Sequence, residues 1–215
     1  MCLLRNPSMY RYTNPGSQNE HLQECILSWH SKHKKFTQIQ IFENLKQVAR
    51  KNHDYACLLG FCYYEGFGTL WNLQESFEWY HISAEHNDAF GQNELGYFYQ
   101  EGYGTKVDHE KALYWYRKSA DNGCSHAKGN LGHCYQDGIH VKRNLRHAFY
   151  WYSKSAEMGD ESGKCNLATM VIRGKGTNID VHQALKLYLE AKNVGHTHVE
   201  QYFRTIFYSL RYSLP

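Results

Sequence analysis

Proline, long apolar runs and paired cysteines are all scarce or absent in this sequence. It contains 3 Pro in 215 residues, which excludes collagen-like and mucin-like chains. No stretch approaches the ~18 consecutive apolar residues that a membrane-spanning helix needs. The segment Met1–Pro7 lacks the apolar core of a signal peptide. We therefore expect a soluble, cytoplasmic protein with no membrane insertion.

The cysteines and histidines form no recognisable chemical site. The 7 Cys are an odd number without C-x-x-C clusters, and the 14 His form no H-E-x-x-H motif or four-ligand set. We expect reduced, mostly buried thiols, no metal and no cofactor. Cys134 follows His133, but neighbouring helical residues point about 100° apart, so they do not form a nucleophile–base pair. We expect no enzyme activity; a hydrolase that uses Cys57 or Cys165 is the remaining alternative.

Charge alternates along the chain. Residues 1–53 carry a net charge of +5, residues 54–124 carry −7, and residues 125–215 carry +5. A nucleic-acid-binding protein more naturally spreads one basic stripe along its length, so the alternation counts against nucleic acid as a partner. The hydrophobic share of 42% is sufficient for a sizeable core in a chain of this length.

A period of 36 residues organises most of the sequence. A Leu-Gly pair marks each of the first three copies, and a Leu-Ala pair stands at the same place in the fourth. These pairs are Leu59-Gly60, Leu95-Gly96, Leu131-Gly132 and Leu167-Ala168. A Trp-Tyr doublet keeps the same period at Trp79-Tyr80, Trp115-Tyr116 and Trp151-Tyr152. Self-similarity at a fixed spacing of this size indicates a repeat architecture.

Each repeat is predicted to be a helical hairpin. The glycine after the leucine removes a side chain and allows a second helix to approach closely. Glycine also accepts the positive φ of a helix end, at Gly66, Gly102, Gly138 and Gly174. The second helix is predicted to begin at residues that cap helices, namely Asn72, Asp108, Asn144 and Asp180. The strict period of the tryptophans predicts that they belong to the core.

The pattern A-x-x-x-L-G-x-x-Y-x-x-G-x-G, a short gap and D-x-x-K-A-x-x-W-Y-x-K-A-A-x-x-G resembles the Sel-one-like repeat family, which is related to tetratricopeptide repeats. Ala127–Gly159 and Leu95–Gly123 carry it best. The resemblance implies an all-α fold, a right-handed α/α superhelix of helical hairpins. It also implies a non-catalytic adaptor or scaffold in signalling or quality control. The alternative is a regulatory subunit or activator of an enzyme, such as a kinase or a membrane-bound synthase.

The register of the pattern divides the chain. Four repeats are expected at residues 54–89, 90–125, 126–161 and 162–196. Residues 1–18 are expected to be flexible, and residues 19–53 to form a degenerate hairpin without the Trp-Tyr doublet. Residues 197–215 are predicted to contain a capping helix, in which Arg204 replaces the glycine that lets a further helix pack.

By analogy with tetratricopeptide arrays, the first helices line a concave face, and their solvent-facing positions flank the Leu-Gly-Tyr stripe. We predict that a partner protein or peptide binds there, at Asp54, Phe61, Tyr64, Glu65, Phe90, Asn93, Tyr97, Gln100, Glu101, His126, His133, Gln136, Asp137 and Arg173.

Two trends in this predicted groove suggest the chemistry of the partner. Aromatic residues crowd the first two repeats, and Glu65, Glu101 and Asp137 form an acidic ladder that reverses at Arg173. Aromatic faces beside carboxylates suit a peptide that carries Lys or Arg, through apolar burial, cation–π contact and charge-assisted hydrogen bonds. The other interpretation is that these carboxylates only solvate an exposed helix face.

Overall fold

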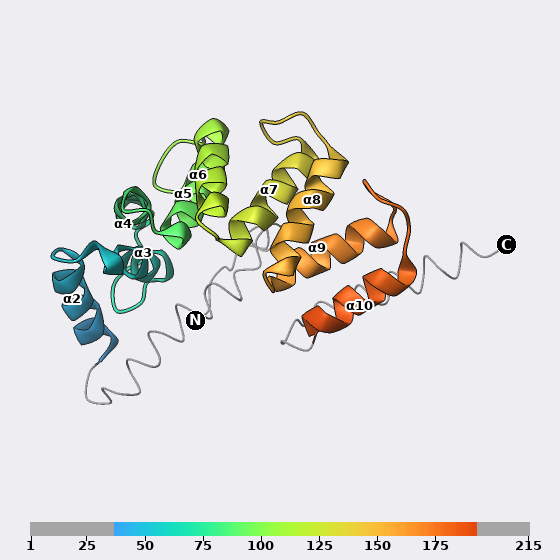
Figure 1. The fold of residues 1–215 in the computed structure, drawn as a ribbon. Coiled ribbons are helices and arrows are strands. Elements are labelled where there is room, and N and C mark those ends of the chain that lie inside the picture. The colour runs from blue at the N-terminus through green and yellow to red at the C-terminus, as the bar shows by residue number, and fades with distance from the viewer. Residues whose placement is uncertain (1–36, 193–215) are drawn as a thin grey trace. The chain divides into compact units, whose positions relative to one another are not determined.

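The structure is a computed structural model that describes residues 37–192 (Figure 1). Within these residues all regular structure is helical, with nine α-helices, one short 3-10 turn η2 (His53–Tyr55) and no strand. The helices are α2 (Gln38–Ala49), α3 (Ala56–Glu65), α4 (Leu73–Glu85), α5 (Ala89–Glu101), α6 (His109–Asp121), α7 (Ser125–Asp137), α8 (Leu145–Glu157), α9 (Glu161–Ile172) and α10 (Val181–Lys192). The predicted all-α fold is confirmed.

Three of the predictions from sequence lie outside the described residues. They are the flexible segment 1–18, the first half of the degenerate hairpin 19–53, and the capping helix within 197–215.

The predicted caps begin the second helices and the predicted glycines end the first ones. At each second helix a side-chain oxygen accepts a hydrogen bond of 2.9–3.1 Å from a backbone N–H two or three residues later; the capping residues are Asn72, Asp108, Asn144 and Asp180. The first helices end at glycines with φ of +61° to +78°, namely Gly66, Gly102, Gly138 and Gly174. Local capping therefore fixes the hairpin boundaries.

The core of each hairpin is built around a tyrosine of the second helix. Tyr80, Tyr116, Tyr152 and Tyr188 are at most 1% exposed. A Cβ placed on Gly60, Gly96 or Gly132 would lie 2.7–2.9 Å from the tyrosine ring of the same hairpin. The Leu-Gly pair is therefore a notch that admits the tyrosine ring, as the close approach predicted from the sequence requires.

The tryptophans are only half-buried, so the prediction that they form the core was wrong. Each precedes the buried tyrosine by one residue, and adjacent helical side chains point about 100° apart, so only the tyrosine faces the first helix. Trp115 instead packs edge to face on Tyr114, with ring centroids 5.1 Å apart, and Lys118 Nζ lies 5.1 Å from the Trp115 ring.

Helix α2 occupies the place of a second helix in a preceding hairpin. Phe42 of α2 meets Tyr63 of α3 with ring centroids 5.2 Å apart and planes at 89°; Phe77 of α4 meets Tyr99 of α5 at 5.4 Å and 88°. The spacing between Phe42 and Phe77 is 35 residues, one fewer than the period. Helix α2 therefore makes the same kind of ring contact as a second helix, although it lacks the Trp-Tyr doublet.

The chain divides into two compact units, Met1–Ala127 (unit 1) and Lys128–Pro215 (unit 2), and the division lies within α7. Unit 1 contains α2 to α6. Unit 2 contains α8 to α10, whose core joins Tyr152 and Tyr188 to Leu167, Ala168 and Val171. Each unit thus repeats the same tyrosine-centred packing.

Candidate functional site

The first helices of unit 1 bury part of the surface that the sequence predicted to face solvent. Phe61 is 2% exposed, Asn93 1% and Tyr97 9%, so the predicted exposure of these three residues was wrong. The reason is that α3 and α5 pack side by side, as the 5.7 Å between the ring centroids of Tyr64 and Phe98 shows. The loop after α5 adds further cover, because the Tyr103 ring lies 5.7 Å from the Tyr97 ring.

Other predicted residues of unit 1 are accessible. Asp54 in η2 and the carboxylates Glu65 and Glu101 are exposed, and Phe90 at the start of α5 is 41% exposed. Tyr64 is half-buried. These accessible side chains, not the full predicted set, are available to a partner.

A cluster of tyrosines lies where α3, α5 and the loop after α5 meet. The Tyr103 ring packs edge to face on Tyr97 and Phe98, with centroid distances of 5.7 Å and 5.6 Å, and lies 6.4 Å from the Tyr64 ring. Tyr103 is not among the residues predicted from the sequence to contact a partner. Its place between Gly102 and Gly104, whose left-handed conformations turn the chain back, was the signal available for it.

Carboxylates surround this cluster. Burial is the main cause that raises the pKa of the Tyr64 hydroxyl, and the nearby Tyr103, Glu94, Glu65 and Glu101 raise it further. Burial likewise raises the pKa of Tyr97, with Glu101 among the contributing charges. The exposed or half-buried residues Tyr64, Glu65, Glu94, Glu101 and Tyr103 are called the acidic aromatic surface below.

Glu94 is the least solvated carboxylate of this surface. Loss of hydration on burial raises the pKa of Glu94 to about 7. A hydrogen bond of 3.0 Å from Asn93 Nδ2 to Glu94 Oε1 lowers this pKa, whereas the negative charge of Asp88 raises it further. Other copies of the repeat have Leu58, Asn130 or Asn166 at this place. A carboxyl group with this pKa changes charge near neutral pH.

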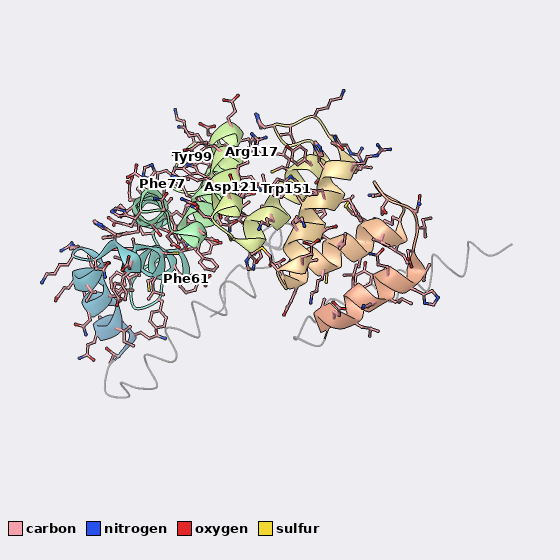
Figure 2. All side chains as sticks on the ribbon, in the orientation of Figure 1. Phe61, Phe77, Tyr99, Arg117, Asp121 and Trp151 are labelled. Carbon is pink, nitrogen blue, oxygen red and sulfur yellow. The ribbon has the colours of Figure 1, made fainter. Side chains whose placement is uncertain are left out.

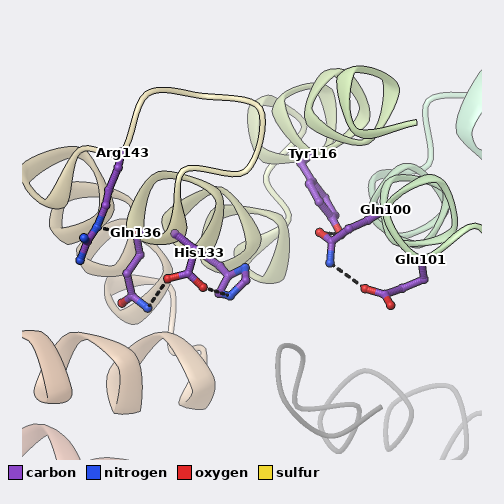
Figure 3. A network of polar contacts seen from close by, with 7 residues as sticks. Gln100, Glu101, Tyr116, His133, Gln136 and Arg143 are labelled. Atoms are coloured by element: carbon purple, nitrogen blue, oxygen red, sulfur yellow. Dashed lines mark hydrogen bonds and ion pairs between the residues drawn. The ribbon is translucent and has the colours of Figure 1, made fainter. Parts of the chain in front are cut away.

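The negative charge extends over three consecutive helices. Residues 52–105, which contain α3, α4 and α5, hold 8 Asp or Glu and no Lys or Arg. Gln100 extends the polar network at the end of α5, because its amide donates to Glu101 Oε1 at 2.9 Å and its carbonyl oxygen accepts from the Tyr116 hydroxyl at 3.2 Å (Figure 3). The sequence of these three helices therefore carries negative charge without any Lys or Arg.

The third rung of the predicted acidic ladder, in unit 2, differs from the first two. Asp137 Oδ2 lies 2.9 Å from His133 Nε2, and Gln136 donates to Asp137 Oδ1 at 3.4 Å. Arg143 Nε donates to the Gln136 carbonyl oxygen at 2.9 Å and so satisfies the end of α7 (Figure 3). Asp137 is therefore held by neighbours of its own helix.

The two remaining predicted residues stand apart from these contacts. His126 is half-buried in the first turn of α7, and its Nδ1 lies 3.5 Å from Ser125 Oγ. Arg173 is exposed at the C-terminal end of α9. The continuous acidic character belongs to unit 1.

Exposed aromatic side chains also occur on second helices, where the sequence analysis placed no site. Tyr114 of α6 is 57% exposed, and Tyr150 of α8 is 51% exposed. Trp151, which follows Tyr150 on α8, is labelled in Figure 2. A lysine ammonium lies within 6.0 Å of an aromatic ring on each helix, Lys118 over Trp115 and Lys154 over Tyr150. These lysines therefore already occupy part of the exposed ring faces on α6 and α8.

The cysteines of residues 37–192 lack the features of a nucleophilic site. The five in the described residues are all buried; they are Cys57, Cys62, Cys124, Cys134 and Cys165. Burial raises the pKa of Cys165 to about 12 and also raises the pKa of Cys57, so both thiols stay protonated near neutral pH, whereas a nucleophile needs the thiolate.

Residues 37–192 contain no group of three His, Cys, Asp or Glu that could hold a metal ion. No helix in that range is long and apolar enough to span a membrane.

The hairpins, their caps and the notch packing define an α-helical solenoid repeat protein. Four copies of the Sel1 repeat match the sequence, at residues 53–88, 89–124, 125–160 and 162–196, so the chain belongs to the Sel1 repeat family. Proteins of this family generally mediate protein–protein interaction and are typically non-catalytic scaffolds. No curated protein is significantly similar to the chain in sequence.

Two solved structures illustrate the likeness. A Sel1 repeat protein from Oxalobacter formigenes is 29% identical with a TM-score of 0.66, and the match covers 77% of this chain and 66% of that one. A protective antigen of uropathogenic Escherichia coli strains with an SLR fold is 30% identical with a TM-score of 0.69, and the match covers 85% of this chain and 40% of the antigen. The chain thus spans less than two thirds of either protein.

Proposed function

We propose that the chain is an adaptor or scaffold whose acidic aromatic surface binds a basic, partly apolar segment of a partner protein. The observation that carries the proposal is that three carboxylates, Glu65, Glu94 and Glu101, are near enough to raise the pKa of Tyr64, whose ring centroid lies 6.4 Å from that of Tyr103. The absence of Lys and Arg from residues 52–105 supports it, because this stretch adds no positive charge of its own beside these carboxylates.

The chemistry of such a surface favours lysine or arginine. A cation over a tyrosine ring gains about 0.5–1 kcal/mol at an exposed site, and an exposed ion pair gains about 0.2–1 kcal/mol. Arginine adds planar, bidentate hydrogen bonding to a carboxylate. Apolar neighbours in the same peptide cover the tyrosine rings and exclude water, which makes the charged contacts stronger.

The test uses a defined probe, a fluorescein-labelled peptide of alternating Arg and Leu, with an alternating Glu and Leu peptide as its control. Fluorescence anisotropy is expected to report binding of the basic peptide only, and the affinity is expected to fall with salt because screening shortens the range of exposed charges. The double variant Glu65→Lys with Glu101→Lys replaces attraction by repulsion at two contacts with the peptide. The binding free energy is expected to fall by about 1.4 kcal/mol or more, which weakens the affinity at least about tenfold.

The matched control is Glu43→Lys with Glu85→Lys. These exposed carboxylates lie in unit 1 on the second-type helices α2 and α4, and the change in net charge is identical. The control is expected to retain the wild-type affinity to within about threefold, with all variants folded by circular dichroism. Equal losses in both double variants would attribute binding to net charge alone and reject the proposed surface.

A further inference from the structure

The segment that joins α7 to α8 is the most basic loop of the repeats. Residues 140–147 hold three of the chain's Lys and Arg residues, two histidines and no carboxylate, and His140, Lys142, Arg143, Arg146 and His147 are all exposed. The equivalent segments 68–75 and 176–183 contain no Lys or Arg, and 104–111 balances two lysines against Asp108 and Glu110. We call residues 140–147 the basic segment.

These cations stand where the helix itself disfavours them. The N-terminal end of a helix attracts negative charge, and the first turns of α4 and α6 hold Glu75 and Glu110, whereas the first turn of α8 contains Arg146 and no acidic residue. The Asn144 side chain already satisfies the N–H groups of Arg146 and His147. The positive charge is therefore carried outward by side chains and has no role in capping α8.

The backbone of the basic segment is held in place. Arg143 Nε donates to the Gln136 carbonyl oxygen at 2.9 Å, and the His147 ring packs edge to face on Tyr135 with centroids 5.1 Å apart. A fixed segment loses little conformational freedom when a partner binds, so its charge is presented in a preorganised form.

The chain itself carries a surface of complementary charge. Residues 52–105 in unit 1 hold eight carboxylates without Lys or Arg, and the acidic aromatic surface lies among them. We propose that the basic segment of one copy of this chain docks on the acidic aromatic surface of a second copy. The two surfaces are different, so the contact is heterologous and can propagate from copy to copy. This inference rests on the proposed function of the acidic aromatic surface.

The contact would regulate the same surface that binds partners. A basic partner and the basic segment of a second copy compete for Tyr64, Glu65 and Glu101, so self-association lowers the concentration of free surface. Salt is expected to weaken the contact because exposed charges attract over only about 10 Å at 0.1 M ionic strength.

Charge reversal on each side provides the test, with the full chain studied by sedimentation velocity over a range of concentrations. Wild-type protein is expected to associate at about 20 mM salt and to be monomeric at about 500 mM. The variants Lys142→Glu with Arg146→Glu, and Glu65→Lys with Glu101→Lys, are each expected to stay monomeric at low salt. An equimolar mixture is expected to associate again, because each variant keeps one native surface and the two reversed surfaces are also opposite in charge.

The control Arg173→Glu with Lys186→Glu makes the same charge change at other exposed cations of unit 2 and is expected to associate like the wild type. Three results would overturn the inference: a wild-type chain that is monomeric at low salt at every concentration, association that persists in either variant alone, or a mixture that does not associate.

The proposed function is tested separately in the same material. The Lys142→Glu, Arg146→Glu variant keeps the acidic aromatic surface, so it is expected to bind the Arg-Leu peptide with undiminished affinity. Peptide binding without self-association of the wild type would reject only this inference. Self-association without peptide binding would reject the proposed preference for a basic peptide. The peptide is also expected to dissociate wild-type assemblies, and failure to do so contradicts a shared surface.

Discussion

Truncation of Tyr116 and of Trp115 provides a sharp comparison, because the two aromatic residues are neighbours in α6 with different burial. Tyr116 is 0% exposed and fills the notch at Gly96, where an added Cβ would lie 2.8 Å from its ring, whereas Trp115 is half-buried. Sequence periodicity treats the two positions alike. Only the packing distinguishes them.

The expected magnitudes follow from that packing. Tyr116→Ala empties a fully buried site, and replacing a large buried aromatic by alanine costs about 3–5 kcal/mol. Trp115→Ala removes a ring that keeps much of its contact with water, so its cost is expected at about 1–2 kcal/mol, nearer to that of an ordinary substitution. Tyr116→Phe keeps the ring and loses the hydrogen bond to Gln100 Oε1, at a cost of about 0.5–1.5 kcal/mol.

Urea unfolding followed by far-UV circular dichroism measures these differences, with the three variants and the wild type examined side by side. The expected order of destabilisation is Tyr116→Ala, then Trp115→Ala, with Tyr116→Phe no greater than the latter. A larger loss for Trp115→Ala than for Tyr116→Ala would refute the tyrosine-centred core and restore the tryptophans to it.

Three further predictions concern caps, charge and glycine. Asn72→Ala is expected to cost about 1 kcal/mol in urea unfolding, whereas Asn72→Asp, which keeps the capping oxygen, stays near the wild type; equal losses would reject the cap. Glu94 has a pKa of about 7 in the folded chain against 4.5 in the reference state, so folding retains its proton and wild-type stability falls as pH rises through this window. Glu94→Gln is expected to stabilise the chain at pH 8 by an amount on the order of 2–3 kcal/mol and to have little effect near pH 4; no pH dependence of the difference would contradict the burial of the carboxyl group. Gly104→Ala places a Cβ against the Leu73 carbonyl and the Phe77 side chain at a φ of +62°, so a loss above about 1 kcal/mol is expected, and an unchanged melting temperature would contradict the close approach.

The features predicted well from the sequence are those that local chemistry decides. Asn72, Asp108, Asn144 and Asp180 cap helices because their short side chains reach nearby N–H groups, and this requires no knowledge of the rest of the fold. The notch glycines were equally predictable, because a small residue repeated at one phase of a helical hairpin indicates close packing.

The features that the sequence did not predict depend on contacts between repeats. The period of 36 residues places Phe61 and Tyr97 at one phase but does not say that the folded chain buries both side chains. Trp79 and Tyr80 are likewise indistinguishable by period, and only the direction of the helix shows which ring enters the core. Glu94 reads as an ordinary surface carboxylate until α5 is placed beside α3, which removes much of its water.

The most direct test of the central claim is chemical footprinting of the carboxylates with the Arg-Leu peptide bound. A carbodiimide and an amine label accessible Asp and Glu side chains, and mass spectrometry then reads the labelling of each peptide. The account predicts that the peptide protects Glu65 and Glu101 but leaves Glu43 and Glu85 as reactive as in the free chain. Protection of Glu43 and Glu85, or of unit 2 alone, would contradict the acidic aromatic surface as the place where partners bind.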